Sequence, residues 1–362
     1  MSAGLENVVA AETILSDVDG KAGNLTIRGR RLDEIAANFR YEDVVALLLD
    51  GFFDDLPDGA ALDRALGAAR VDIFDRIRPV MPALAALDIY DGVRAGVALL
   101  PDGERLADAL RLIAAPGVIL PALLRMAKGH SPIEPDGAVT HAADMIRMSG
   151  RADPGERLAR ALDTYLVTVC DHGLNASTFA ARVVASTRAG LASAVLAGLG
   201  ALKGPLHGGA PGPVIAMLDA IAAAGNASDW IDEELSKGTR LMGFGHRLYR
   251  VRDPRADALK AALHRMGASA ARADRLALAE HVERIALDAL RSAKPDRVLQ
   301  TNVEFYTALL LEAVGFPAHA FTCVFAAGRV TGWIAHAREQ QATGRLIRPQ
   351  SRYVGPRPAL AA

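Results

Sequence analysis

The chain has 362 residues, of which 51% are hydrophobic and 23% are charged, which is the composition of a folded globular protein. That length exceeds what one hydrophobic core usually organises, so we expect two lobes. A formal net charge of -1 gives no reason to expect nucleic acid or an anionic membrane as a partner. Cys170 and Cys323 stand in apolar runs without paired spacing, which predicts neither a disulfide framework nor a cysteine metal site.

The first residues lack the basic start and apolar core of a secretion signal, and we expect a cytoplasmic protein. Residues 14–31, with Asp19-Gly20 and Arg28-Gly29, are the one stretch that predicts a hairpin. From there on, apolar residues recur at helical spacing with Ala and Leu as the main fillers, so the predicted fold class is all-α. Residues 32–49 predict a helix, within which Tyr41 could begin a second one.

Two later stretches predict buried helices. Residues 161–187 follow one helical pattern that we expect to break near Gly173. Residues 189–202 carry no charged side chain and are rich in Gly, Ala and Ser. The segment is too short to span a membrane. Because small residues let helices approach closely, this segment belongs either in the core or at a subunit interface.

Composition changes after Gly209, which predicts a smaller helical domain inserted into a larger one. Residues 229–297 carry more charge, and apolar density returns at Val303. We therefore expect the first part of the large domain at 1–209, the small domain at 210–315, and the return of the large domain with a C-terminal strap at 316–362. The strap, from Arg348 onward, holds several prolines and no periodic pattern, which predicts extended chain.

Among the nine histidines, three stand next to glycines or at breaks in helical patterns. His207 lies in Gly204-Pro205-Leu206-His207-Gly208-Gly209, where glycine lets backbone and ligand approach the ring. Pro211 and Pro213 predict a helix just beyond it, and the N-terminus of that helix would disfavour the imidazolium form. A neutral histidine can donate a hydrogen bond to a carbonyl that becomes an enolate.

The second histidine is His246, in Gly243-Phe244-Gly245-His246-Arg247, which is followed by Arg250, Arg252 and Arg255. Arginines this close in sequence repel each other unless anions are near, although a solvated basic face is the alternative. The third is His172, in Asp171-His172-Gly173, which could equally be a packing residue at a helix end.

One carboxylate and two later arginines complete the candidates. Glu304, in Thr301-Asn302-Val303-Glu304-Phe305-Tyr306, has apolar neighbours, and burial would raise its pKa toward that of a general base. A solvent-facing glutamate on a helix fits the same position. Arg329 and Arg348 stand in apolar company, where a buried guanidinium needs an anion or a carboxylate. No constellation of metal ligands is present in the sequence.

Taken in order, GPLHGG, MGFGHRLYRVRDPRA, TNVEFY, FAAGRVTGW and RLIRP resemble the citrate synthase family from end to end. The stretches SDVDGKAGNLTIRGRRLDEIA and DHGLNASTFAARVVAST fit the same family. The resemblance implies a helical homodimer whose small domain closes over the substrates. It also implies an acyltransferase that condenses acetyl-CoA with oxaloacetate to citryl-CoA, and then hydrolyses this intermediate to citrate and CoA.

The resemblance implies a role for each candidate residue. His207 would hydrogen-bond the acetyl carbonyl, Glu304 would remove a methyl proton, and His246 would polarise the ketone carbonyl of oxaloacetate. The oxaloacetate carboxylates would be held by His172, Arg255, Arg329 and, from the other subunit, Arg348. CoA would be met by Leu241, Met242, Gly243, Arg250 and Asn302. Acetyl-CoA is then a substrate, and neither a permanently bound cofactor nor a metal is implied.

Two departures from the commoner family pattern leave alternatives open. Glu304 stands where Asp is usual and is one methylene longer, and a shift of about 1 Å in a catalytic group can cost about a hundredfold in rate. Ala210-Pro211-Gly212-Pro213 stands where Ala-Asn-Glu is common, and could reshape the acyl pocket. A 2-methylcitrate synthase that uses propionyl-CoA therefore stays open, because one methylene is worth only about 1–3 kcal/mol in a pocket.

Two other classes of protein fit less well. A citryl-CoA lyase would run the cleavage, but no CoA-ligase domain is seen in the sequence. An inactive paralogue could act as a helical interaction module. The retained histidines and arginines argue against this reading, since a site without function has no reason to keep buried charges that cost folding energy.

Overall fold

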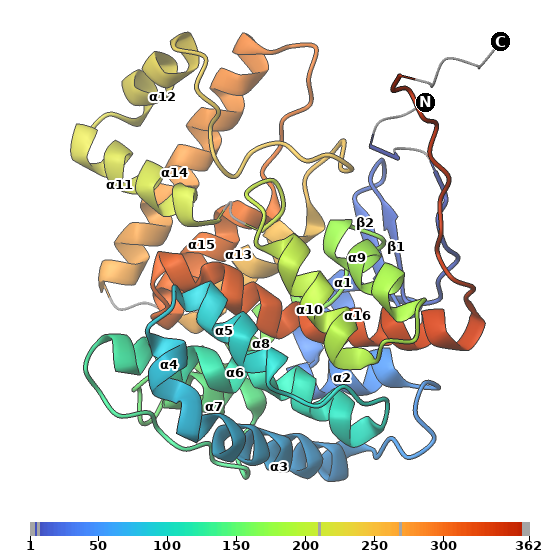
Figure 1. Ribbon diagram of the computed structural model, residues 1–362. Helices are drawn as coiled ribbons and strands as arrows, with labels where there is room; N and C mark the ends of the chain where they lie inside the picture. The colour runs from blue at the N-terminus through green and yellow to red at the C-terminus, as the bar shows by residue number, and fades with distance from the viewer. Residues whose placement is uncertain (1–3, 6–7, 209–210, 268–269, 357–362) are drawn as a thin grey trace, which may run out of the picture.

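Helices make up 63% of the chain and strands 3%, which confirms the predicted all-α class. The computed structural model describes residues 4–5, 8–208, 211–267 and 270–356. Figure 1 shows a large body of packed helices from which a smaller group of helices projects at the upper left.

The strands form one small antiparallel sheet where the sequence predicts a hairpin. They are β1 (Ser16–Asp19), β2 (Asn24–Ile27) and β3 (Arg30–Arg31). Ser16 pairs with Ile27 and Asp19 with Asn24, so residues 20–23 make the turn between β1 and β2. Leu25 and Ile27 are buried against the helices, which fixes the register because a shift by one residue would turn both side chains to solvent.

The first part of the large body consists of short and long helices in chain order. They are α1 (Leu32–Asn38), α2 (Tyr41–Leu49), α3 (Gly59–Ile77), η1 (Arg78–Val80), α4 (Met81–Ala85), α5 (Ile89–Ala98), α6 (Leu106–Ala127) and α7 (His141–Met148). The second helix start expected at Tyr41 is confirmed. By length and composition α6 could cross a membrane, but 89% of its most apolar window is buried inside the structure, as in a core helix.

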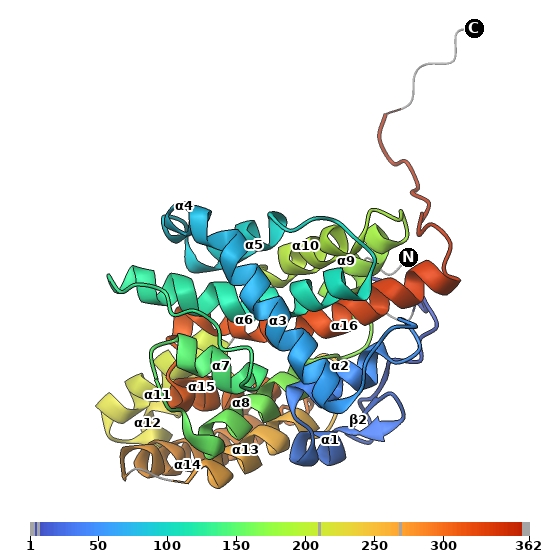
Figure 2. The same cartoon turned by 90° about the horizontal axis from the view of Figure 1, so that it is seen from below.

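A long C-terminal helix, α16 (Phe321–Thr343), crosses the middle of this body (Figure 2). It packs against α6 and against three further helices, α8 (Gly155–Val169), α9 (Ala176–Ala185) and α10 (Leu191–Leu202). The break expected near Gly173 is confirmed, because it lies between α8 and α9. Gly198 lets α10 approach α16 closely, since a Cβ at that position would lie 2.7 Å from the indole of Trp333.

The remaining helices lie between α10 and α16 in sequence. They are α11 (Pro211–Ala224), α12 (Ala227–Ser236), α13 (Pro254–Met266), α14 (Ala270–Ala293), α15 (Val303–Val314) and η2 (Ala318–Ala320). α11, α12 and α14 pack on one another in the projecting group, whereas α13 and α15 pack against α8 of the large body. The domain boundaries at 209/210 and 315/316 stay a prediction, and residues 209 and 210 lie outside the described residues.

The chain after α16 is extended from residue 344 to residue 356, as expected for the strap (Figure 1). The last expected strap residues, 357–362, lie outside the described part of the chain. Ile347 N–H, directly before the strap, donates to Ser186 Oγ at 3.0 Å and so ties this part of the chain to the end of α9.

The core of the large body holds buried carboxyl groups as well as apolar side chains. Asp163 on α8 is 2% exposed, and its Oδ1 accepts a hydrogen bond from Tyr41 N–H at 3.0 Å. Glu42 is also buried and accepts from His141 N–H at 2.6 Å. Burial, with the nearby charge of Glu42, raises the pKa of Asp163 to about 7. Below about pH 7 Asp163 is therefore mostly protonated in the folded protein, whereas an unfolded aspartate is already ionised above about pH 4.

We predict that Asp163→Asn flattens the pH dependence of stability. Between about pH 4 and about pH 7 the folded protein holds a proton on Asp163 that the unfolded chain releases, so the free energy of unfolding falls as pH rises. Asparagine keeps the acceptor for Tyr41 and cannot ionise. As the pH rises from about 4 to about 7, the free energy of unfolding of the variant should therefore increase relative to that of the wild type, by up to about 1.4 kcal/mol for each pH unit. Urea denaturation across this range measures the slope, and an unchanged slope would contradict the assignment.

Candidate active site

Three segments far apart in sequence bring two histidines and two arginines into one cluster. His172 lies in the break between α8 and α9, His246 between α12 and α13, Arg255 in the first turn of α13, and Arg329 on α16. The rings of His172 and His246 meet edge to face with centroids 5.7 Å apart. His246 Nε2 lies 3.2 Å from Arg255 Nη2. These four residues are called the basic cluster below.

Glycine geometry shapes the His246 loop, which comprises residues 237–253. Gly243 and Gly245 have φ angles of 84° and 82°, a region that side chains other than glycine rarely adopt. Backbone hydrogen bonds tie this loop to the segment before α15: Gly245 N–H donates to Gln300 O at 2.7 Å, and Asn302 N–H donates to Gly243 O at 2.9 Å. The two glycines thus place His246 beside the N-terminus of α15.

Backbone hydrogen bonds fix the tautomer of His246. Its Nδ1 accepts from the N–H groups of Leu248 and Tyr249 at 3.0 and 3.1 Å, so the hydrogen of the neutral ring resides on Nε2. Burial, and then the charge of Arg255, lower the pKa of His246 to about 4. His246 is therefore neutral near pH 7 and presents an Nε2–H donor.

Asp253 holds Arg255 in place. Its carboxylate accepts from Arg255 Nε at 3.0 Å and from Nη2 at 2.8 Å, and also caps α15 by accepting from Val303 N–H. Asp253 is 1% exposed and Arg255 is 4% exposed, so the ion pair is desolvated and the guanidinium is held in one orientation. In the contact between Arg255 and His246, the Nη2 donor of the arginine lies opposite the Nε2–H donor of the histidine. An acceptor oxygen near both would resolve it, which marks the place for an anion or a carbonyl group.

Arg329 is buried on α16 without a carboxylate paired to it. Its Nε donates to the Val169 carbonyl at 2.5 Å, and its guanidinium lies 4.7 Å from the centroid of the Phe325 ring. The described residues offer its terminal nitrogens no hydrogen-bond partner. Burial lowers the pKa of Arg329 to about 10, against the opposing charge of Asp171. A buried guanidinium with unused donors is suited to a carboxylate ligand.

His172 completes the cluster beside a tyrosine. Its Nε2 lies 3.1 Å from the hydroxyl of Tyr249, whose side chain is 2% exposed. Burial, and then the charges of Arg255 and Arg329, lower the pKa of His172 well below its ordinary value. The ring is therefore neutral, and its surroundings favour an added negative charge.

His207 lies in the segment between α10 and α11 and is held by a serine. Its Nε2 lies 2.8 Å from Ser177 Oγ, and the same oxygen accepts from Trp333 Nε1–H at 3.1 Å. Ser177 Oγ donates in turn to Asn175 Oδ1 at 2.8 Å, and the same amide oxygen accepts the N–H groups that cap α9. The contact with Ser177 orients the His207 ring through Nε2 and leaves Nδ1 as the ring nitrogen available to a ligand.

The pKa of His207 is lowered to about 4, as expected, but for a different reason. The sequence suggested the N-terminus of the following helix as the cause, and α11 does begin four residues later, at Pro211. The structure instead gives burial as the larger cause and the charge of Arg329 as the second. Arg329 therefore acts on His207 as well as on His172, and it links the two halves of the site.

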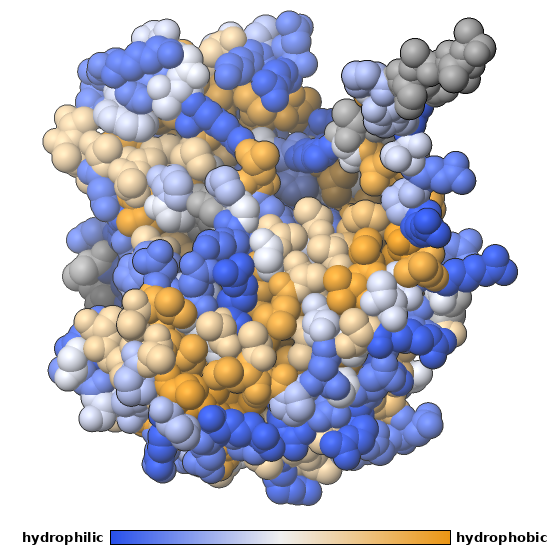
Figure 3. All heavy atoms as spheres, viewed as in Figure 1, coloured by the Kyte–Doolittle hydropathy of each residue, from blue (hydrophilic) through white to orange (hydrophobic). Residues whose placement is uncertain are grey.

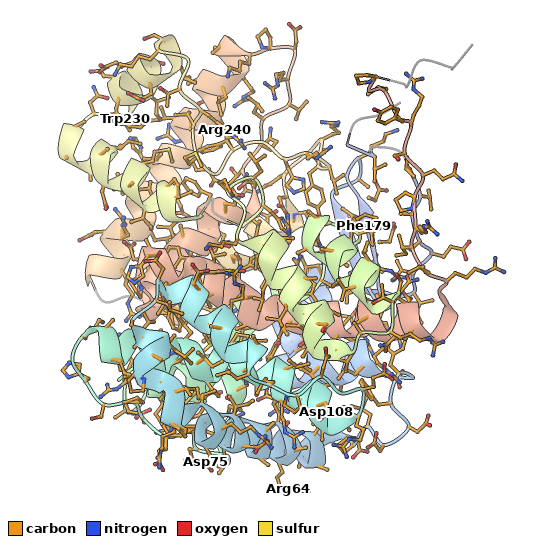
Figure 4. The ribbon with its side chains drawn as sticks, viewed as in Figure 1. Arg64, Asp75, Asp108, Phe179, Trp230 and Arg240 are labelled. Atoms are coloured by element: carbon orange, nitrogen blue, oxygen red, sulfur yellow. The ribbon has the colours of Figure 1, made fainter. Side chains whose placement is uncertain are left out.

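Glu304 lies in the first turn of α15, next to the His246 loop. The helix starts there because Asn302 Oδ1 accepts from Glu304 N–H at 3.0 Å, an N-cap bond. The side chain is partly buried, and burial raises the pKa of Glu304 against the opposing charges of Arg240 and Arg255. Arg240 lies in the segment that follows α12 (Figure 4).

The other residues predicted for the site lie outside the basic cluster. Arg348 is exposed in the strap and contacts none of the basic cluster, so a single chain leaves it outside the site. Arg250 is exposed, Leu241 is buried, and the Asn302 side chain donates to Gly245 O at 2.8 Å while capping α15. Met242 and Gly243 lie in the His246 loop. Contacts of these residues with CoA stay a prediction.

Sequence reasoning missed several residues that shape the site: Tyr249, Asp253, Ser177, Trp333 and Arg240. Asp253 stands directly before Pro254, a pattern typical of a helix N-cap, and could have been found from that signal. Ser177 and Trp333 have no such signal, because their contact joins α9 to α16 across 156 residues. Among the described residues, no group of three or more His, Cys, Asp or Glu is placed to hold a metal ion.

Comparison with known proteins agrees with this site. The family profile for the C-terminal domain of citrate synthase matches residues 4–350. Citrate synthase from Haloferax volcanii is 36% identical over 97% of this chain and 95% of its own. Citrate synthase from Thermotoga maritima is 30% identical, with a TM-score of 0.84 over 100% of this chain and 98% of its own.

A third relative was solved as a complex. Citrate synthase from Thermoplasma acidophilum, in a ternary complex with carboxymethyl coenzyme A and oxaloacetate, is 29% identical with a TM-score of 0.86, over 100% of this chain and 98% of its own. The chain belongs to the citrate synthase family, whose members are acyltransferases.

We predict that Asp253→Ala lowers stability strongly, because it leaves the buried Arg255 without its paired carboxylate. Breaking a buried ion pair on one side typically costs about 3–5 kcal/mol. Asp257→Ala is the matched control, since its side chain is 59% exposed in an ion pair with Arg252 and should contribute less than about 1 kcal/mol. Urea denaturation compares the two variants, and equal losses would show that the Asp253 pair is not desolvated in solution.

Proposed function

We propose that this protein condenses acetyl-CoA with oxaloacetate and hydrolyses the resulting citryl-CoA to citrate and CoA. The observation that carries the proposal is the basic cluster, where two buried guanidinium groups and two neutral imidazoles face one another. A small dicarboxylate with a ketone group matches these donors. Its carboxylates can accept from Arg255, Arg329 and His172, and its ketone oxygen can accept from His246 Nε2–H.

His246 and the arginines would divide the work on oxaloacetate. The arginines hold the carboxylates in two-point fashion, which fixes the orientation of the ketone. His246 Nε2–H then hydrogen-bonds the ketone oxygen as this oxygen takes on negative charge during attack. Because the His246 ring is neutral and its Nδ1 is occupied by two backbone donors, its one N–H is available for this bond.

Glu304 and His207 would act on the acetyl group. The Glu304 carboxylate takes a proton from the methyl carbon, and His207 Nδ1–H hydrogen-bonds the thioester oxygen as the enolate forms. This role of His207 requires the Ser177 hydroxyl to turn from Asn175 Oδ1 to His207 Nε2. Burial supports both roles: it raises the pKa of Glu304, which makes the carboxylate a stronger base, and it keeps His207 neutral. The nucleophilic carbon then attacks the oxaloacetate ketone, and water hydrolyses the thioester of citryl-CoA.

CoA is assigned to the face formed by the His246 loop and Arg250. This assignment is supported by the resemblance and by the Thermoplasma acidophilum relative, which was solved with carboxymethyl coenzyme A. Leu241, Met242 and Gly243 would present backbone groups to CoA, with Asn302 behind them. The exposed guanidinium of Arg250 is free to meet a phosphate group.

A propionyl-CoA substrate, giving 2-methylcitrate, is the second candidate. The observation behind it is the sequence Ala210-Pro211-Gly212-Pro213 directly after His207, although Ala210 lies outside the described residues. Thiol release from acetyl-CoA and from propionyl-CoA, each with oxaloacetate, tests both. We expect kcat/KM to favour acetyl-CoA. A preference for propionyl-CoA would reassign the substrate, and no thiol release from either would support the inactive interaction module.

The proposal includes a cytoplasmic homodimer. Hydrophobic side chains gather on the face over α5, α9 and α10 (Figure 3), and α9 and α10 are helices with small residues that allow close packing. The exposed Arg348 also has no ion-pair partner among the residues that the structure describes, as a residue that completes a neighbouring site would. Light scattering at micromolar concentration measures the assembly, and an active monomer would contradict it.

His207→Ala should lower turnover by about a hundredfold or more, the usual scale for losing a donor to a developing oxyanion. Oxaloacetate binding should survive, because it is assigned to the basic cluster and not to His207. Steady-state kinetics and isothermal titration with oxaloacetate measure the two effects separately. Loss of oxaloacetate binding with turnover otherwise intact would reverse the assignment.

Glu304→Gln should stop the exchange of acetyl methyl protons into deuterated water, because glutamine keeps the size of the side chain and cannot accept a proton. The exchange is followed by NMR with a non-reacting oxaloacetate analogue bound. Glu304→Asp tests geometry: if the backbone has adapted to Glu, the shorter acid should react about ten to a hundred times more slowly. Unchanged exchange in Glu304→Gln would place the base elsewhere.

A further inference from the structure

The N-terminal hairpin makes contacts that the proposed chemistry does not use. It touches the His172 loop (residues 170–175) and also the His246 loop. Among the described residues, no backbone hydrogen bond joins these two loops directly. The hairpin therefore lies where it can set the spacing between the two histidines, which come from segments 74 residues apart.

The first strand of the hairpin holds the His172 loop. Ser16 Oγ on β1 accepts from Gly173 N–H at 2.8 Å and donates to the Asp171 carboxylate. Asp171 is fully buried, and it also meets His336 Nε2 on α16 at 3.2 Å. One serine thus bonds to both neighbours of His172, and it fixes the backbone that carries this ring.

The turn of the hairpin holds the His246 loop. Arg250 N–H donates to Gly20 O at 2.7 Å. A Cβ on Gly20 would lie 2.3 Å from the carbonyl oxygen of Leu248, so only glycine permits this approach. The next residue on the loop, Val251, packs in the same way on Gly23, where a Cβ would lie 2.7 Å from its Cγ2.

The docked part of the His246 loop is the part that sets the site. Leu248 and Tyr249 donate their N–H groups to His246 Nδ1, and the Tyr249 hydroxyl reaches His172 Nε2. A shift of residues 248–250 away from the hairpin would therefore move the His246 donor and break the link between the two rings.

We propose that the β1–β2 hairpin is a positioning element that fixes the His172 and His246 loops at the spacing needed to bind the dicarboxylate. This inference rests on the proposed oxaloacetate site. Gly20 provides the close approach at the His246 loop, and Ser16 provides the anchor at the His172 loop. Loops held in place before binding lose less conformational freedom on binding, so the hairpin acts on affinity for the dicarboxylate. CoA is assigned to residues 241–243 and Arg250 of the His246 loop, so the Ser16 anchor at the His172 loop is the part of the hairpin that acts on the dicarboxylate alone.

The test compares Gly20→Ala with Lys21→Ala, an exposed neighbour in the same turn. Isothermal titration gives the Kd for oxaloacetate, steady-state kinetics give KM for each substrate, and hydrogen exchange reports on residues 246–252. Gly20→Ala should raise the Kd and KM for oxaloacetate by about tenfold or more, since displacement of a binding group by about 1 Å carries that scale of loss. Exchange in residues 246–252 should rise, and Lys21→Ala should match the wild type.

Ser16→Ala provides a second variant if Gly20→Ala does not fold. It removes the hydroxyl on β1 and should also weaken oxaloacetate binding more than acetyl-CoA binding. Wild-type affinity for oxaloacetate in a folded Gly20→Ala or Ser16→Ala variant would overturn the proposal, and so would equal increases in KM for both substrates in Ser16→Ala. A wild-type protein that binds no oxaloacetate would instead refute the proposed function itself.

Discussion

The burial of positive charge where three distant segments meet is the constraint on which the rest of the site depends. Arg255 and Arg329 are both nearly inaccessible to solvent, and a buried guanidinium is costly unless its donors and its charge are matched. Asp253 matches Arg255 with two hydrogen bonds. Among the described residues, Arg329 has only a carbonyl on Nε and the more distant charge of Asp171. The unmatched donors make the cluster a place where an anion is stabilised.

This imbalance ties ligand binding to folding. A dicarboxylate that satisfied Arg329 in the folded chain alone would stabilise the fold by RT ln(1 + [L]/Kd), an amount that grows with the ligand concentration. The ion pair of Asp253 with Arg255 has a different task, because it is complete without ligand. Asp253 also accepts from Val303 N–H, so one carboxylate sets both the arginine and the start of the helix that carries Glu304.

Three histidines share one electrostatic environment and differ in what holds them. Burial lowers the pKa of each, and a nearby arginine adds to the effect. His246 is oriented by two backbone N–H groups, His207 by the Ser177 hydroxyl and His172 by Tyr249. Orientation by backbone leaves a single tautomer for His246. Burial acts on the pKa of Glu304 in the opposite direction and raises it, because burial disfavours the charged form of a carboxyl group.

Local signals in the sequence were enough to predict the hairpin, several of the helices and the candidate site residues. The hairpin, the second helix start at Tyr41 and the break at Gly173 follow from turn residues and helical spacing, which depend on neighbours along the chain. The glycines around His246 likewise indicate a backbone conformation with positive φ, which only glycine adopts easily. The family resemblance rested on such segments in their order.

Only the tertiary structure decided how these segments act on one another. Tyr249 against His172, Trp333 on Ser177, and Gly20 beneath Leu248 are contacts between segments distant in sequence, and no local pattern specifies them. The lowered pKa of His207 comes from burial and from Arg329 on another helix. Arg348, whose sequence setting resembled that of Arg329, stays at the surface of its own chain. Burial and charge coupling arise from the packing of the whole chain, so their strength at one residue is set by groups that the sequence places far away.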